Sequence, residues 1–100
     1  MDFNENLFSS LNNLGLIYKN QREYKLSIKY FLSALNVNPK NYLVVYNLAQ
    51  LFDEIEVYDK AKDFYIKTIN LNPSYGNAIV GFYNLLLKTC LLYTSDAADE

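Results

Sequence analysis

The chain has 100 residues, of which 51% are hydrophobic and 20% are charged, a composition typical of one small globular domain and unlike that of a disordered segment. Its net charge is −2 and its nine basic residues are scattered along the chain, so no basic patch for a nucleic acid is expected. The first residues, MDFNENLF, lack the basic and long apolar regions of a secretory signal, and a cytoplasmic location is therefore expected.

The first predicted elements are two amphipathic helices. Apolar residues recur at steps of four, three and four from Leu7 to Tyr18, and at the same steps from Tyr24 to Leu35. Each run therefore forms one apolar stripe along a helix. The segment 19–23 between them is wholly polar and short, so the two helices are expected to be antiparallel neighbours.

The next two predicted elements repeat this scheme. Apolar side chains recur from Val45 to Phe52, the polar segment DEIE interrupts them at 53–56, and a second apolar stripe runs from Tyr58 to Ile69. Two further antiparallel helices are therefore expected.

A constant spacing relates the two halves, and we call it the repeat offset. It is the distance along the sequence from Pro39 to Pro73, each of which follows an asparagine. Because proline cannot continue a helix and pushes the preceding residue toward extended conformation, each Asn-Pro pair is expected to end a helix. The similar phrases LNVNPKNY and INLNPSYG are therefore interpreted as repeat boundaries. Other identical pairs at this offset are Asn13 and Asn47, Leu14 and Leu48, Tyr24 and Tyr58, Asn36 and Asn70, and Asn38 and Asn72.

The periodic sequence resembles the tetratricopeptide repeat, whose 34-residue pattern has Leu, Gly and Tyr in a first helix, then Ala, Phe, Ala and Pro. The repeat offset equals the length of this pattern. The matching segments are LNNLGLIY at 11–18 with REYKLSIKYFLSALNVNP at 22–39, and VYNLAQLF at 45–52 with VYDKAKDFYIKTINLNP at 57–73.

The resemblance implies an all-α fold, an antiparallel helix-hairpin solenoid of two full repeats plus the first helix of a third. The full repeats are expected at about 8–41 and 42–75, and the partial repeat at 76–89.

The sequence leaves the register of the third unit open. A strict repeat offset puts Tyr83 at a position that is small in the other units, whereas aligning FYNLLLK with VYNLAQLF requires three extra residues. The apolar run from Ala78 to Tyr93 is short for a membrane span and is interrupted by Asn84 and Lys88. It is interpreted as the first helix of a third repeat and not as a membrane segment.

The last segment, CLLYTSDAADE at 90–100, differs in composition from the rest. It looks like the frame translation of a transposase-based sequencing-library adapter, and scars of this kind are excluded from reasoning about a fold. We therefore expect a non-native tail at 90–100 that follows a solenoid fragment at 1–89, the N-terminal part of a longer protein. Cys90, the one cysteine, then says nothing about the redox compartment.

No motif predicts catalysis, a metal site or a cofactor, and the chain is not expected to be an enzyme by itself. It has no histidine, and Gly15, Gly76 and Gly81 are isolated, so no phosphate-binding loop is expected. The acidic residues at 53–63 lack the glycine and the ligand spacing of a calcium loop. Ser9 has no partner base and is expected to cap or pack near the start of the first helix.

The resemblance to the tetratricopeptide repeat implies a scaffold for protein–protein interaction. Repeats of this family bind peptides or partner helices on a concave face that the first helices line. A protein or peptide partner is therefore expected, and neither a nucleic acid nor a membrane. Carried over position by position, the resemblance predicts a groove of Ser9, Asn12, Leu16, Lys19, Asn20, Leu43, Tyr46, Gln50, Asp53, Glu54, Asn77 and Val80.

Two other roles stay open at this level. The repeats could be the regulatory arm of a larger enzyme, such as a glycosyltransferase or a signalling enzyme, whose catalytic domain lies outside this chain. They could also self-associate, because a first helix without its second helix leaves an apolar face uncovered at the C-terminal end of the stack.

Overall fold

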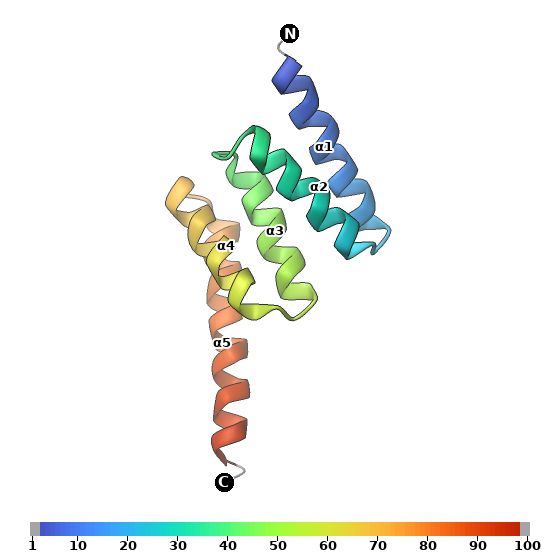
Figure 1. The fold of residues 1–100 in the computed structure, drawn as a ribbon. Helices are drawn as coiled ribbons and strands as arrows, with labels where there is room; N and C mark the ends of the chain where they lie inside the picture. Colours follow the sequence, from blue (N-terminus) through green and yellow to red (C-terminus); the bar gives the residue numbers. More distant parts are fainter. Residues whose placement is uncertain (1–2, 99–100) are drawn as a thin grey trace.

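Five helices follow one another along the described part of the chain. The computed structural model describes the backbone of residues 3–98 and the side chains of residues 3–90, and the described part contains no strand. Figure 1 shows two helical hairpins, with a long fifth helix packed beside the second hairpin. The predicted all-α stack of helical hairpins is confirmed. The helices are α1 (Phe3–Asn20), α2 (Tyr24–Val37), α3 (Tyr42–Glu54), α4 (Tyr58–Leu71) and α5 (Gly76–Ala98).

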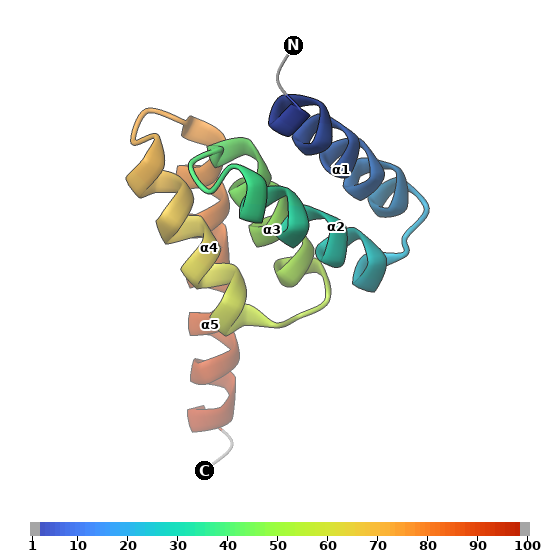
Figure 2. The same ribbon diagram turned by 45° about the horizontal axis from the view of Figure 1, so that its top comes forward.

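The helices pack mainly with their neighbours in the chain. The helix α1 packs along α2, and α3 packs along α4, while α2 also contacts α3 and α4 also contacts α5. A smaller contact joins α3 to α5. The molecule measures 59 × 29 × 18 Å, and α5 extends well past the α3–α4 hairpin (Figures 1 and 2). Contacts between successive helices that build an elongated body are the geometry of a solenoid.

The same turn closes both hairpins. Arg22 and Glu56, which are one repeat offset apart, have the left-handed backbone conformation, with φ of 62° and 66°. The residue after each donates its N–H to a carbonyl in the last turn of the preceding helix, Glu23 to Tyr18 at 2.9 Å and Val57 to Phe52 at 2.8 Å. A left-handed residue that returns the chain to such a carbonyl is a common way to end a helix. The two hairpins therefore repeat each other in backbone geometry as well as in sequence.

The recurring Asn-Pro pair ends the second helix of each hairpin. The N–H of Asn38 donates to the Ala34 carbonyl at 2.9 Å, and that of Asn72 donates to the Thr68 carbonyl at 2.9 Å. The side-chain oxygen of each asparagine then accepts from a backbone N–H two residues on, as in an Asx turn. Both α2 and α4 stop before the proline, as the sequence predicts.

The core of the first hairpin forms where its helices approach most closely. Phe31 is fully buried, and its ring lies against Gly15 of α1. The hydroxyl of Ser27 donates to the Gly15 carbonyl at 2.7 Å, which satisfies a buried polar group. Small residues at both places allow this approach. The buried cluster comprises Phe31, Ala34, Leu35, Val44, Val45, Leu48, Ala49, Leu51, Phe52, Ala61, Tyr65 and Leu85.

The structure settles the register of the third unit. Ala78 and Leu85 are fully buried in α5, and they lie one repeat offset after Val44 and Leu51, which are buried in α3. The strict spacing therefore continues into α5, and no insertion of three residues is needed.

One side of α5 is apolar and uncovered. Ile79, Tyr83 and Leu86 are 46%, 62% and 39% exposed. By the same spacing they correspond to the residues of α3 that are buried in the second hairpin: Val45, Ala49 and Phe52. Among the described residues no further helix packs on this side of α5. Tyr83 at the small position is therefore accommodated, because nothing approaches it there.

The structure changes two expectations about the first helices. The helix α1 begins at Phe3, so Ser9 lies in mid-helix with an exposed side chain and caps nothing. Asp53 and Glu54 belong to the last turn of α3, and the break between helices falls at 55–57.

Cys90 is exposed, and the side chains of 91–100, where most of the expected adapter tail falls, lie outside the described residues. Among the described residues, none of the helices has the length and apolar character needed to cross a bilayer.

Candidate binding groove

A chain of hydrogen bonds joins the first helices of the two hairpins. The ammonium of Lys19, in the last turn of α1, donates to Oε1 of Gln50 on α3 at 3.3 Å. The Nε2 of Gln50 donates in turn to the hydroxyl oxygen of Tyr46, one turn earlier on α3, at 2.9 Å. The two bonds fix the Gln50 amide in one orientation, with its oxygen toward Lys19 and its nitrogen toward Tyr46.

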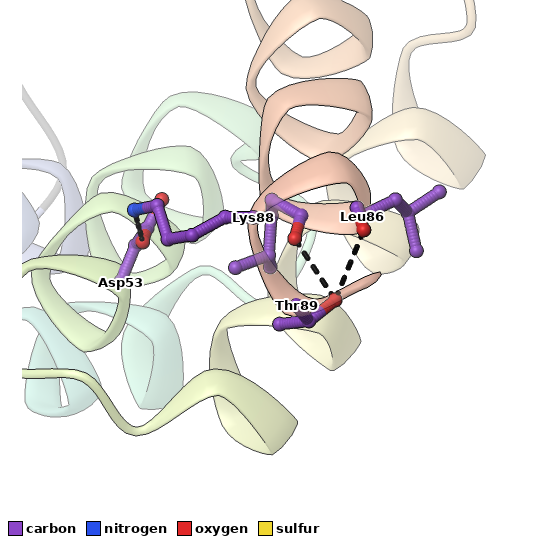
Figure 3. Close-up of polar contacts among 5 residues, drawn as sticks. Asp53, Leu86, Lys88 and Thr89 are labelled. Carbon is purple, nitrogen blue, oxygen red and sulfur yellow. Dashed lines mark hydrogen bonds and ion pairs between the residues drawn. The ribbon is translucent and has the colours of Figure 1, made fainter. Parts of the chain in front are cut away.

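An ion pair joins α3 to α5. The Nζ of Lys88 lies 2.9 Å from Oδ1 of Asp53, with the two side chains 48% and 20% exposed (Figure 3). The hydrogen bond to Asp53 raises the pKa of Lys88 above its usual value, so Lys88 is cationic at neutral pH. A pair exposed to this extent contributes about 0–1 kcal/mol to stability. Its main effect is to hold the two charges at a fixed place between the helices.

Thr89, which follows Lys88 in the sequence, is hydrogen-bonded within its own helix. The hydroxyl of Thr89 donates to the carbonyls of Leu85 and Leu86 at 3.0 and 3.2 Å (Figure 3). The Thr89 hydroxyl therefore bonds back to the preceding turn of α5.

These contacts surround one open hollow of about 400 Å³, which we call the first-helix groove. Its walls come from α1, α3, α4, α5 and the turn between α3 and α4. Three carboxylates and two ammonium groups line it, and one carboxylate is paired with Lys88. The lining residues are Lys19, Gln50, Asp53, Glu54, Glu56, Tyr58, Tyr65 and Lys88.

Tyr65 lines this groove with a phenol that stays protonated. The residue is only 3% exposed. Burial raises the pKa of Tyr65 far above its usual value, and the negative charge of Asp53 raises it further. The hydroxyl is therefore a hydrogen-bond donor at every pH at which the protein would ordinarily work.

A cluster of tyrosines supports Tyr46. Its ring meets the rings of Tyr65 and Tyr75 edge to face, with centroids 6.2 and 5.2 Å apart, and the Tyr75 ring meets that of Tyr42 at 5.1 Å. Burial is the main reason that the pKa of Tyr46 lies above its usual value. Edge-to-face aromatic pairs of this kind contribute about 0.5–1.5 kcal/mol each. Tyr46 is therefore held in place before any partner arrives.

The structure brings together five of the predicted groove residues. Lys19, Gln50, Asp53 and Glu54 line the first-helix groove itself, and Tyr46 is bonded to Gln50 at its edge. Lys19 and Asp53 occupy equivalent positions of the two repeats, so the stacking of the repeats assembles this group.

Two further predicted residues lie outside this group and do not line the first-helix groove. Asn12 is half-buried on α1, and its Oδ1 is buried with no hydrogen-bond partner among the described residues. Ser9 lines a different hollow of about 470 Å³, near the N-terminal end of α1 and the α2–α3 connection. Ser9 is thus separated from the polar cluster around Gln50.

The remaining predicted residues are exposed along the first helices. Leu16 and Leu43 present apolar surface on α1 and α3, and Val80 does so on α5. Asn20 is exposed at the end of α1. The amide of Asn77 donates to the hydroxyl oxygen of Tyr75 at 3.4 Å, which ties it to the edge of the tyrosine cluster.

The sequence prediction missed several residues that shape the groove. Lys88 lies one repeat offset after Glu54, and this spacing would have found it had the register of the third unit been trusted. Tyr58 and Tyr65 lie on the second helix of their repeat, outside the predicted first-helix pattern, yet both line the groove. Glu56 belongs to the turn and has no equivalent in the groove pattern of first helices.

The groove shows no arrangement suited to metal binding. Across the described side chains, no group of three His, Cys, Asp or Glu residues is placed to hold a metal ion. What the groove offers is a fixed amide, a protonated phenol and charges of both signs, a set able to hydrogen-bond polar groups.

Comparison with known proteins identifies the repeat. Residues 8–41 match the sequence model of the tetratricopeptide repeat, and residues 44–75 match a second model of the same repeat. A curated relative, the uncharacterized protein ycf37 of Pyropia yezoensis, is 29% identical over 72 residues, which are 72% of this chain and 40% of that protein. The chain thus spans less than half of that relative's length.

A solved structure shows the same arrangement of helices. A point mutant of MamA superimposes with a TM-score of 0.74 at 22% identity, covering 82% of this chain and 60% of that one. At this identity the likeness concerns the fold. The two matched repeats at 8–41 and 44–75 cover more than half of the chain, which therefore belongs to the tetratricopeptide-repeat family.

Proposed function

We propose that this chain is a protein-interaction scaffold that binds a peptide segment in the first-helix groove. Tetratricopeptide repeats generally mediate contacts between proteins. The observation that carries the proposal is the hydrogen-bonded chain from Lys19 through Gln50 to Tyr46, because it crosses two repeats and pre-orients a polar side chain at the groove. Groups fixed before binding lose little conformational entropy when a partner arrives.

The chemistry of the groove indicates the kind of peptide. Gln50 supplies an amide, which can exchange its present partners for the backbone of an extended peptide. Leu16 on α1 and Leu43 on α3 supply exposed apolar surface along the first helices. Tyr46 lies at the middle first helix, where aromatic residues at the centre of a contact patch usually contribute most to binding. A segment with apolar and amide side chains fits these groups best.

The charges of the groove favour a modest dependence on salt. Lys19 is offset by Asp53 and Glu54, and Asp53 is already paired with Lys88. Raising the salt concentration through the range that screens surface pairs should change affinity by less than about tenfold. With few repeats in contact, a dissociation constant in about the micromolar range or weaker is expected.

The test uses peptides selected from a random peptide library displayed on phage against the immobilised protein. Selected peptides are synthesised, and their affinity is measured by calorimetry with the wild type and with the Tyr46→Ala, Gln50→Ala double variant. The double variant should bind at least about tenfold more weakly, because it removes the aromatic surface and the oriented amide together.

A matched control removes the same residue types elsewhere. Tyr83→Ala with Gln21→Ala deletes an exposed tyrosine of α5 and an exposed glutamine of the α1–α2 turn. This control should bind like the wild type. Equal affinity of all three proteins would place the binding surface outside the first-helix groove and would refute the proposal.

We also propose that the uncovered face of α5 drives self-association. Ile79, Tyr83 and Leu86 form an apolar strip at positions that are buried by a second helix in the preceding repeat. Contiguous apolar surface of this kind is usually covered in a stable protein. The same strip on a second copy is available to cover it.

A further inference from the structure

A second groove runs between the two second helices, α2 and α4. It is an open hollow of about 390 Å³ that is lined by Leu32 of α2, Phe52 of α3, and Lys60, Asp63, Phe64 and Lys67 of α4. Leu32 is 44% exposed at its wall.

This hollow continues toward the end of the first repeat. An adjoining hollow of about 460 Å³ shares Leu32 and Lys67 with the hollow over Phe52 and Phe64, and it extends along α2 to Pro39. We call the two together the second-helix groove. Their combined length along α2 and α4 suits a short peptide segment better than a single small molecule.

The second-helix groove faces away from the first-helix groove. On α4, Tyr58 and Tyr65 line the first-helix groove, whereas Lys60 and Lys67 line the second. At 3.6 residues per turn, Lys60 and Lys67 lie on the opposite side of α4 from the two tyrosines. A partner could therefore occupy one groove without touching the other.

The floor of the second-helix groove is a pair of stacked rings. The rings of Phe52 and Phe64 are nearly parallel, with an interplanar angle of 10° and centroids 5.4 Å apart. The equivalent pair in the first repeat, Tyr18 and Tyr30, stacks in the same way at 5.5 Å and 11°. Among the described residues no repeat lies before that first pair, whereas α2 walls the second pair. In the second repeat, where the stacked pair forms the groove floor, both rings are phenylalanines. They lack hydroxyl groups, so the floor is apolar.

The rim of the groove is basic. The ammonium of Lys60 lies 5.5 Å from the centre of the Phe52 ring, a distance at which the ring face attracts a cation. Lys67 makes no ion pair with any described side chain, and Asp63 is the one acidic residue of the lining. On α2, Lys25 and Lys29 share the face of Leu32, because they precede it by seven and three residues.

We propose that the second-helix groove binds an acidic peptide segment that carries apolar side chains. An apolar side chain of the segment would fill the hollow over Phe52 and Phe64, and carboxylates on either side would pair with Lys60 and Lys67. A nucleic acid has no apolar side chain for this floor. A flat membrane surface would not reach rings that lie recessed between two helices. An acidic and apolar segment can contact the apolar floor with its apolar side chains and pair with the lysines of the rim through its carboxylates.

The experiment measures fluorescence anisotropy with three labelled synthetic peptides of about ten residues each. The first has leucine and phenylalanine set among glutamates and aspartates. The second keeps the apolar residues and replaces the acids with lysines, and the third keeps the acids and replaces the apolar residues with alanine. The first peptide should bind at least about tenfold more tightly than either control peptide, because it alone satisfies floor and rim together.

Charge-reversed variants locate the site. Lys60→Glu with Lys67→Glu should weaken binding of the first peptide at least about tenfold, and Leu32→Asp should do so as well. Lys40→Glu makes the same charge change on an exposed loop outside both hollows and should alter affinity by less than about twofold. Circular dichroism checks that each variant keeps the helical fold of the wild type.

The outcomes separate this proposal from the proposed function. Tyr46→Ala with Gln50→Ala should leave the affinity for the acidic peptide unchanged, since those residues lie in the other groove. Equal binding of all three peptides, or equal loss of binding on Lys40→Glu, would overturn the proposal. Tight binding to phosphatidylserine vesicles or to a DNA duplex with no binding of the acidic peptide would overturn it too, and would assign the lysines to an anionic surface.

Discussion

The ring of Phe31 occupies the space beside the α-carbon of Gly15, so that a Cβ added to Gly15 would lie 2.7 Å from two carbons of the ring. Real Cβ contacts are longer than this, and Phe31 is fully buried and has little room to move. We expect Gly15→Ala to lower the free energy of unfolding by about 1–3 kcal/mol, although alanine favours a helix. Urea denaturation measures the effect.

Two further variants check that the cause is this contact. Gly76 has no atom within 4 Å of an added Cβ, so Gly76→Ala should leave stability unchanged or increase it. Phe31→Leu should cost stability in the wild type but less in the Gly15→Ala background, because the smaller side chain leaves room for the new methyl group. Additive losses in the double variant would show that the two residues do not interact.

Ser27→Ala should lower the free energy of unfolding by about 0.5–1.5 kcal/mol, because it removes the buried hydrogen bond from Ser27 to the Gly15 carbonyl. Ser33 makes a similar bond to the Lys29 carbonyl in an exposed position. Ser33→Ala should therefore change stability by less than about 0.5 kcal/mol. Thermal or urea unfolding of the two variants compares them directly, and equal losses would contradict the role assigned to the helix contact at Gly15.

Stability should fall as the pH rises above about 10, partly because of Tyr65. Burial and Asp53 raise the pKa of Tyr65 in the folded protein above its unfolded value. Below the unfolded pKa both states hold the proton, so the full stability is present. Above it, the unfolded state releases the proton and the folded state keeps it, so stability is lost. The raised pKa of Lys88 acts in the same direction.

The measurement is the free energy of unfolding in urea at several alkaline pH values. Tyr65→Phe should lose up to about 1.4 kcal/mol less per pH unit than the wild type, which is the effect of one proton. Tyr83→Phe, which deletes an exposed hydroxyl on α5, controls for the loss of a tyrosine as such. The contribution of Tyr65 would be ruled out if Tyr65→Phe and the wild type kept the same slope.

Self-association through α5 should weaken when its uncovered face becomes charged. Ile79→Lys with Leu86→Lys replaces two exposed apolar side chains of that face and should shift the protein toward monomer in sedimentation velocity. Ile66→Lys makes the same kind of change on an exposed part of α4 and should have little effect. An unchanged distribution of species in the double variant would show that another surface joins the copies.

The repeat offset made the fold predictable from the sequence. It placed the helices and the stops at Pro39 and Pro73, which depend on local patterns that repeat. The same offset could have placed Lys88. The other units have a small residue at the position of Tyr83, and this mismatch argued against the strict register. The sequence alone does not reveal that this position of α5 is uncovered.

The candidate site was less predictable, because it depends on how neighbouring repeats lie against each other. The bond from Lys19 to Gln50 and the pair of Asp53 with Lys88 join residues 31 and 35 positions apart. Their formation depends on side-chain rotamers and on the angle between helices. The sequence indicated Tyr46 as a groove residue, and the structure adds that its ring is packed by Tyr65 and Tyr75.

The most direct test of the proposal that the first-helix groove binds a peptide is a titration of the isotope-labelled protein with a library-selected peptide, followed through backbone amide chemical shifts. We expect the largest changes on α1 and α3, around Lys19, Tyr46 and Gln50, with smaller changes near Lys88 on α5. Changes confined to α2 and the outer side of α4 would contradict it, because those residues line the opposite face of the stack.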